Sequence, residues 1–83
     1  MKLPFETLER WLKWAERMHA THLLILKEVN EFSVLFGPAA VYRDESPTRI
    51  IELYKTKIRD VDEVYKLHEP WDAQIKNART WNV

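Results

Sequence analysis

A single glycine in 83 residues, Gly37, is the feature that most constrains what this chain can fold into. Sheets need frequent turns, and glycine most readily adopts the backbone conformations that tight turns require. With 46% hydrophobic and 31% charged residues around it, so little glycine favours helix throughout the chain. Prolines at positions 4, 38, 47 and 70 then divide the chain into a long segment, a loop, a second segment and a short tail.

The first segment repeats apolar or seam positions at alternating spacings of four and three, the period of one face of a helix. This spacing predicts a helix over about residues 4–36, with Pro4 in its first turn and Gly37 as its C-terminal cap. The positions of the row are Leu8, Leu12, Ala15, His19, His22, Leu26, Val29, Ser33 and Phe36.

The second segment shows the same spacing after a loop over residues 37–46. Ser46 followed by Pro47 has the pattern of an N-cap and a first helical residue. We expect a helix over about residues 47–69 and a short helix over about residues 71–80. The apolar row of the helix over residues 47–69 is Ile51, Tyr54, Ile58, Val61, Tyr65 and His68. That of the short helix is Trp71, Ile75 and Ala78, which Trp81 would extend.

These elements predict an all-α fold in one domain, residues 1–83: an antiparallel hairpin of two long helices with a short C-terminal helix against it. The apolar arc of the first helix spans about half its circumference, which is wider than one neighbouring helix covers. Exposed apolar patches of that size usually mark protein interfaces. We therefore expect a homodimer or a protein partner that completes a helical bundle. The alternative is that the aromatic side chains form the core of a small bundle.

The predicted partner-binding face combines side chains from the first helix with two loop residues and one lysine among the apolar positions of the second helix. Tryptophan is a residue type common at interface hot spots, which strengthens the assignment. The candidate residues are Trp11, Trp14, Met18, Ile25, Phe32, Tyr42, Arg43 and Lys57.

Charge and cysteine content exclude several classes of protein. Thirteen basic residues balance thirteen acidic ones, and this zero net charge argues against a nucleic-acid partner. The chain has no cysteine, which rules out disulfides and thiolate zinc sites and fits a reducing cytoplasm. The N-terminus lacks an apolar signal-peptide core and no aliphatic run reaches the length of a membrane span, so we expect a cytoplasmic protein with no membrane contact.

Two histidines three residues apart are the candidates for metal chemistry. Glu16 and His19 have the Glu-x-x-His spacing that carboxylate-bridged di-iron bundles use, and His22 follows on the same face of the predicted helix. Such bundles need this motif twice with two further glutamates, and here it occurs once. The histidines alternatively form hydrogen bonds on a helix seam, or make an interface sensitive to pH. We expect no bound metal and no cofactor.

A pair of glutamates supports a second alternative. Glu28-x-x-Glu31 resembles the first half of the magnesium-binding signature of all-alpha nucleotide pyrophosphohydrolases of the MazG type. In that family a second pair, Glu-x-x-Asp, lies on a later helix, and the four carboxylates gather Mg²⁺ around a polyphosphate. Asp60-x-x-Glu63 is the nearest match here, in reversed order. The alternative to this resemblance is that all four acids are solvated surface charges.

No glycine-rich phosphate loop and no cysteine nucleophile occurs in the chain. The leading prediction is therefore a small non-enzymatic helical protein that acts by protein–protein interaction. It would serve as an adaptor, regulator or inhibitor, of bacterial or phage origin, and would work as a homodimer.

Overall fold

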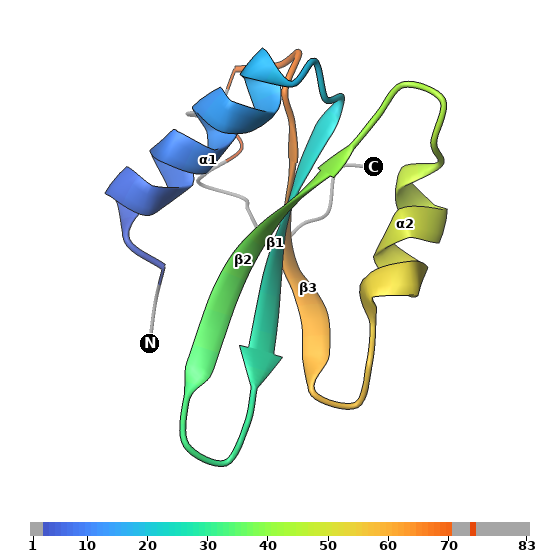
Figure 1. The fold of residues 1–83 in the computed structure, drawn as a ribbon. Helices are drawn as coiled ribbons and strands as arrows, with labels where there is room; N and C mark the ends of the chain where they lie inside the picture. Colours follow the sequence, from blue (N-terminus) through green and yellow to red (C-terminus); the bar gives the residue numbers. More distant parts are fainter. Residues whose placement is uncertain (1–2, 71–73, 75–83) are drawn as a thin grey trace.

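In the computed structural model, which describes residues 3–70 and Gln74, two helices flank a three-stranded antiparallel sheet (Figure 1). The order along the chain is α1 (Phe5–Arg17), β1 (His22–Val29), β2 (Val34–Val41), α2 (Pro47–Tyr54) and β3 (Arg59–Lys66). The strands lie in the order β2-β1-β3, so β1 is central. The fold is α+β, and the all-α helical bundle predicted from the sequence is wrong.

The sheet is covered on both faces, with α1 on one side and α2 on the other (Figure 1). Successive residues of β1 serve the two faces: Leu23 and Ile25 pack with α1, whereas Leu24 packs on the α2 side. A strand buried on both faces carries a continuous apolar run instead of an alternating pattern. The two cores are Leu8, Leu12, Ala15, Leu23, Ile25 and Tyr65 on the α1 side, and Leu24, Ala39, Val41, Ile51, Val61 and Val64 on the α2 side.

Helix α1 ends at Arg17 because His19 takes up a left-handed backbone conformation, with φ of 59°. The Ala20 N–H donates to the Ala15 carbonyl at 3.0 Å, and the His19 N–H donates to the Glu16 carbonyl at 3.1 Å. This pair of bonds is the Schellman termination, which usually has glycine at the left-handed position. The predicted single helix over residues 4–36 is therefore wrong, although its apolar row as far as Ala15 does belong to α1.

The hairpin between β1 and β2 turns without glycine. The Asn30 Oδ1 accepts hydrogen bonds from the N–H groups of Phe32 and Ser33, each at 2.9 Å, and from the Ser33 hydroxyl at 3.2 Å. An asparagine side chain replaces backbone hydrogen bonds in this way in many turns. Gly37 lies inside β2, so its predicted role as a helix cap is also wrong.

Helix α2 begins as predicted and ends early. The Ser46 side chain accepts a hydrogen bond from the Arg49 N–H at 3.5 Å, with Pro47 as the first helical residue, which confirms the predicted start. The helix ends at Tyr54, so the predicted helix over residues 47–69 is wrong: its second half is the strand β3.

A β-bulge in β3 explains why this strand has a helical pattern in the sequence. Glu63 pairs with Ile25 and Val61 pairs with Leu26, which leaves Asp62 as an extra residue. The extra residue places Val61 and Val64 on the same face of the sheet, although they are three positions apart. A spacing of three is what one face of a helix also produces.

The predicted helix over residues 71–80 lies outside the described residues, apart from Gln74. Trp71, Ile75 and Ala78, on which that prediction rested, lie there too. Within the described part of the chain, no helix is both long and apolar enough to cross a bilayer.

Candidate interaction surfaces

Some of the exposed apolar side chains lie at one end of the molecule, on two segments joined by a hydrogen bond. The tip of the β1–β2 hairpin carries Phe32, which is 91% exposed, and the loop between α2 and β3 carries Ile58, which is 51% exposed. Val29 is 47% exposed, and its N–H donates to the Ile58 carbonyl at 2.8 Å. We call Val29, Phe32 and Ile58 the tip surface.

Side chains hold both segments of the tip surface in place. Asn30 fixes the turn that carries Phe32, as described above. In the neighbouring loop, the Thr56 Oγ1 accepts hydrogen bonds from the Ile58 N–H at 3.3 Å and from the Arg59 N–H at 3.0 Å. A surface ordered before binding loses less conformational entropy when a partner arrives.

An open concavity of about 570 Å³ adjoins the tip surface and includes two of its residues, Val29 and Ile58. Its charges are mixed, since Lys27 and Lys57 lie among its walls together with Asp60 and Asp62. Arg59 also lines the concavity and contacts α2, where its Nε donates to the Tyr54 carbonyl at 2.8 Å and its guanidinium lies 5.6 Å from the centre of the Tyr54 ring. An apolar patch beside mixed polar groups has the composition of a protein interface.

The outer edge of β3 is largely closed by hydrogen bonds from other parts of the chain. Leu67 donates to the Thr21 carbonyl and Val29 donates to the Ile58 carbonyl, so the peptide groups of Leu67 and Ile58 face β1. Because successive peptide groups of a strand face opposite sides, those of Arg59, Val61, Val64 and Lys66 point away from β1. Three of these four N–H groups are bonded: Arg59 to the Thr56 hydroxyl, Val61 to the Asp60 carboxylate at 2.8 Å, and Lys66 to the Gln74 Oε1 at 2.6 Å. The fourth belongs to Val64.

Gln74 bonds both the N–H and the carbonyl of Lys66, because its Nε2 also donates to the Lys66 carbonyl at 2.8 Å. The side-chain amide thus occupies the place of a residue in a neighbouring strand. The same Nε2 lies 3.3 Å from the carbonyl oxygens of Glu69 and Pro70, and Gln74 is buried.

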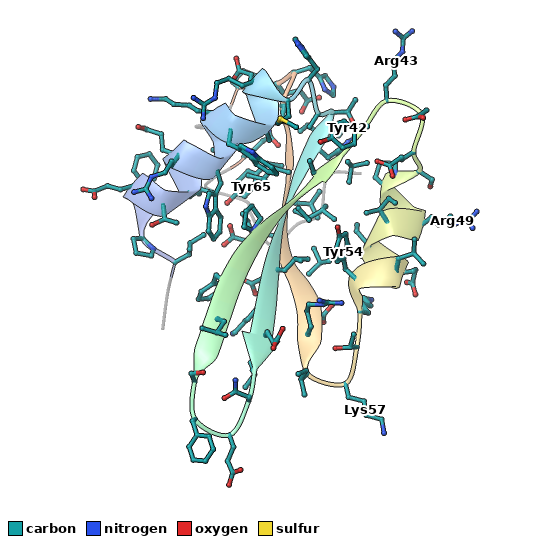
Figure 2. All side chains as sticks on the ribbon, in the orientation of Figure 1. Tyr42, Arg43, Arg49, Tyr54, Lys57 and Tyr65 are labelled. Atoms are coloured by element: carbon teal, nitrogen blue, oxygen red, sulfur yellow. The ribbon has the colours of Figure 1, made fainter. Side chains whose placement is uncertain are left out.

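The predicted partner-binding residues do not form one face. Trp11 and Trp14 are partly buried against the α1 core, and Ile25 is fully buried in the sheet. Met18 is exposed at the end of α1. Figure 2 places Arg43 and Lys57 at opposite ends of the molecule, with Tyr42 near Arg43. Phe32 and Lys57 are the predicted residues that the structure brings to the end that carries the tip surface.

The predicted metal candidates lie on different kinds of backbone. Glu16 is exposed in α1, His19 is the exposed left-handed residue, and His22 is buried at the start of β1. Within the described residues, no three histidine, aspartate or glutamate side chains gather closely enough to hold a metal ion.

His22 lies in a mixed polar environment at the end of the sheet. Its Nδ1 is 2.9 Å from the Thr21 hydroxyl, while its Nε2 is buried and has no hydrogen-bond partner among the described residues. Burial lowers the pKa of His22, and the positive charges of His68 and Lys66 lower it further, against a smaller opposing effect of Glu69. Neutral His22 is therefore the form that the fold favours.

The four acids of the pyrophosphohydrolase resemblance do not lie on helices. Glu28 is in β1, Glu31 is in the hairpin turn, and Asp60 and Glu63 are in β3. Glu63 accepts a hydrogen bond from the hydroxyl of Tyr65, and burial together with this bond raises the pKa of Tyr65. The two-helix arrangement that the resemblance implies is therefore contradicted by the fold.

Three residues that shape these surfaces were missed in the sequence: Asn30, Thr56 and Gln74. The first had a usable signal, since Asn30-Glu31-Phe32-Ser33 separates two runs rich in apolar residues, and asparagine and serine are turn residues. Thr56 bonds the N–H groups two and three positions later, the local pattern of a threonine turn, so it too had a usable signal. Gln74 had none, because it bonds Lys66, eight positions earlier, which only the folded chain brings near.

Comparison with protein families, curated proteins and solved structures gives no match for this chain. The assignment of a function therefore rests on the surfaces described above.

Proposed function

We propose that this protein is a non-enzymatic interaction protein, an adaptor, regulator or inhibitor, which binds another protein through the tip surface. The observation that carries the proposal is the exposure of Phe32, 91%, on a turn whose geometry Asn30 fixes. A large aromatic side chain held in solvent forgoes the free energy of burial, about 2 kcal/mol, until a partner covers it. We place this activity in the cytoplasm, in keeping with the cysteine-free composition.

The tip surface would provide the apolar centre of the contact. Phe32 projects from the hairpin turn and Val29 ends strand β1 of the same hairpin, while Ile58 lies on the loop before β3, which its hydrogen bond with Val29 tethers to the hairpin. The lysines and aspartates of the adjoining concavity would form a polar rim, which orients a partner more than it adds affinity. This arrangement differs from the helical face predicted from the sequence, since Ile25 lies in β1 and Phe32 in the hairpin turn, not on a helix.

The test compares two phenylalanines. Immobilised wild-type protein captures its partner from the native host, the partner is identified and purified, and its dissociation constant is measured by titration calorimetry. We expect Phe32→Asp to weaken binding at least about thirtyfold, since a hot-spot aromatic contributes about 2 kcal/mol or more. Phe5→Asp is the matched control, because Phe5 is 56% exposed on α1 and away from the tip surface.

Circular dichroism should show the same fold for both variants. Equal affinity of wild type and Phe32→Asp for the purified partner would exclude the tip surface as the binding site. Equal weakening by Phe32→Asp and Phe5→Asp would do the same.

A further inference from the structure

The two edges of the sheet differ in how many of their outward N–H groups form hydrogen bonds with the rest of the chain. At β3, three of the four outward N–H groups are bonded by Thr56, Asp60 and Gln74. Natural sheets usually protect their edges by such capping, by charges or by bulges, because open edges pair with other strands. β3 has the caps and also a bulge at Asp62.

The outer edge of β2 has none of the caps seen at β3. Asn30 donates to the Ser33 carbonyl, and the alternation of the ladder from this pair directs the peptide groups of Val34, Phe36, Pro38 and Ala40 away from β1. Within the described part of the chain, the N–H groups of Val34, Phe36 and Ala40 donate no hydrogen bond. Figure 1 shows β2 crossing in front of β1 and β3, with α1 and α2 to the two sides.

The sequence of β2 also lacks the charges that normally guard an edge strand. Val34-Leu35-Phe36-Gly37-Pro38-Ala39-Ala40-Val41 contains no charged residue, and Leu35 is 55% exposed. A strand without charge meets an identical strand without like-charge repulsion. The chain as a whole has zero formal net charge, so two copies do not repel one another at long range either.

We propose that a second copy of this chain pairs with β2 along its outer edge, antiparallel, so that the two sheets become one. This inference goes beyond the proposed function and does not rest on it, since it uses β2 and not the tip surface. It also differs from the dimer expected from the sequence, in which helices would complete a bundle.

A two-fold axis at Gly37 would pair the outward N–H groups of β2 with outward carbonyl groups of the second copy. In that register Val34 pairs with Ala40 of the second copy, and Phe36 pairs with Pro38 of the second copy. Every available N–H then finds a carbonyl, and the one missing donor is that of Pro38, which has no N–H. Gly37 faces its own counterpart, and a Cβ built at Gly37 would meet nothing within 4 Å, so no part of the described chain packs over this point of the strand.

The test measures association and the protection of single amides in the full chain. We expect sedimentation to show a dimer that dissociates on dilution. Hydrogen exchange at the amides of Val34, Phe36 and Ala40 should slow at least tenfold at concentrations where the dimer forms. The Val64 amide, which faces outward on β3, is the internal control and should keep its exchange rate.

Two substitutions target the edge and one serves as control. Leu35→Lys adds a charge to the edge, and Val34→Pro removes one outward N–H without touching the bonds to β1. Each should weaken dimerisation at least tenfold. Leu53→Lys changes a leucine that is 66% exposed on α2 and should leave the dimer intact.

A monomer at every concentration would overturn the inference, and so would a dimer that persists in both edge variants. Protection of the β2 amides only after a different protein is added would assign the edge to that partner instead. If an edge variant fails to fold, the exchange pattern of the wild type still decides. Phe32→Asp separates the two proposals, because it should weaken partner binding and leave the dimer unchanged.

Discussion

Single residues take over the roles that glycine plays in most sheets. His19 adopts the left-handed conformation that ends α1, and Asn30 closes the hairpin with its side chain. One glycine was therefore enough for a fold with a sheet, and that glycine has no positive φ. The inference from glycine scarcity to helix failed because other side chains supplied the turn geometry.

Replacing His19 by glycine should stabilise the protein. A residue with a Cβ is strained at the φ of 59° that His19 adopts, and glycine is not. We expect His19→Gly to raise the free energy of unfolding by about 0.5–1 kcal/mol in urea denaturation. His19→Ala keeps the Cβ and should give no such gain. An equal effect of both substitutions would show that the gain does not come from the backbone conformation.

Protonation of His22 should destabilise the fold. Its pKa in the folded state lies below the ordinary value of 6.5, so the folded chain binds fewer protons than the unfolded chain just below that pH. Stability is then complete above about pH 6.5 and falls as the pH drops from there toward the folded pKa. Urea denaturation at about pH 7.5 and about pH 5.5 should show this loss.

His22→Gln should reduce that loss, because glutamine does not titrate. His19→Asn, which removes an exposed imidazole and tolerates the left-handed conformation, should keep the slope of the wild type. A slope that His22→Gln leaves unchanged would assign the pH dependence to other groups.

Among the elements, β3 depends most on contacts that are remote in sequence. Its bulge adjusts the register between Ile25 and Leu26, and its last residue, Lys66, is held by Gln74 eight positions later. Helix α2, in contrast, begins with a local signal, Ser46 and Pro47. Local signals made the start of α2 predictable, whereas the strand character of β3 came from its pairing with β1.

Removal of the Gln74 amide should loosen the end of β3. Gln74→Ala leaves the outward N–H and carbonyl of Lys66 without these bonds, and we expect a loss of about 1–3 kcal/mol in the free energy of unfolding. Gln74→Glu keeps an acceptor for the Lys66 N–H but places a buried carboxylate oxygen against the carbonyl oxygens of Lys66, Glu69 and Pro70, so it should be at least as destabilising. Urea denaturation measures both, and faster hydrogen exchange at the Lys66 amide should accompany them. Full stability in Gln74→Ala would mean that water replaces the amide without cost.

At the scale of the whole molecule, the described residues form a sheet enclosed between two helices, in a chain of 83 residues. Two small cores therefore share one central strand, and β1 contributes to both. A domain of this size has a small free energy of unfolding, so loss of packing in either core should destabilise the whole fold.

Truncation of neighbouring leucines on β1 should test this three-layer arrangement. Leu23 and Leu24 point to opposite faces and are both fully buried. We expect Leu23→Ala and Leu24→Ala each to cost about 2–5 kcal/mol in the free energy of unfolding, by loss of packing and creation of a cavity. Leu53→Ala on the exposed side of α2 should change it by less than about 0.5 kcal/mol. A large cost for only one of the two β1 leucines would mean that one face of the sheet is uncovered.

The sequence by itself determined the local features whose physical cause lies within a few residues. The apolar row Leu8, Leu12 and Ala15 did mark a helix, and Ser46-Pro47 did begin one. The zero net charge and the lack of cysteine are likewise properties of the sequence alone.

Only the tertiary structure decided where helix gave way to strand. The aliphatic run from Leu23 to Leu26 fits a buried strand and a buried helix equally well, because a segment covered on both sides loses its periodicity. The spacing of Val61 and Val64 matched a helix because a bulge inserts Asp62 between them. The tip surface likewise exists only because the hairpin and the loop before β3 meet in space, through the hydrogen bond from Val29 to Ile58. Strand pairing is a long-range interaction, and no short window of sequence contains both of its partners.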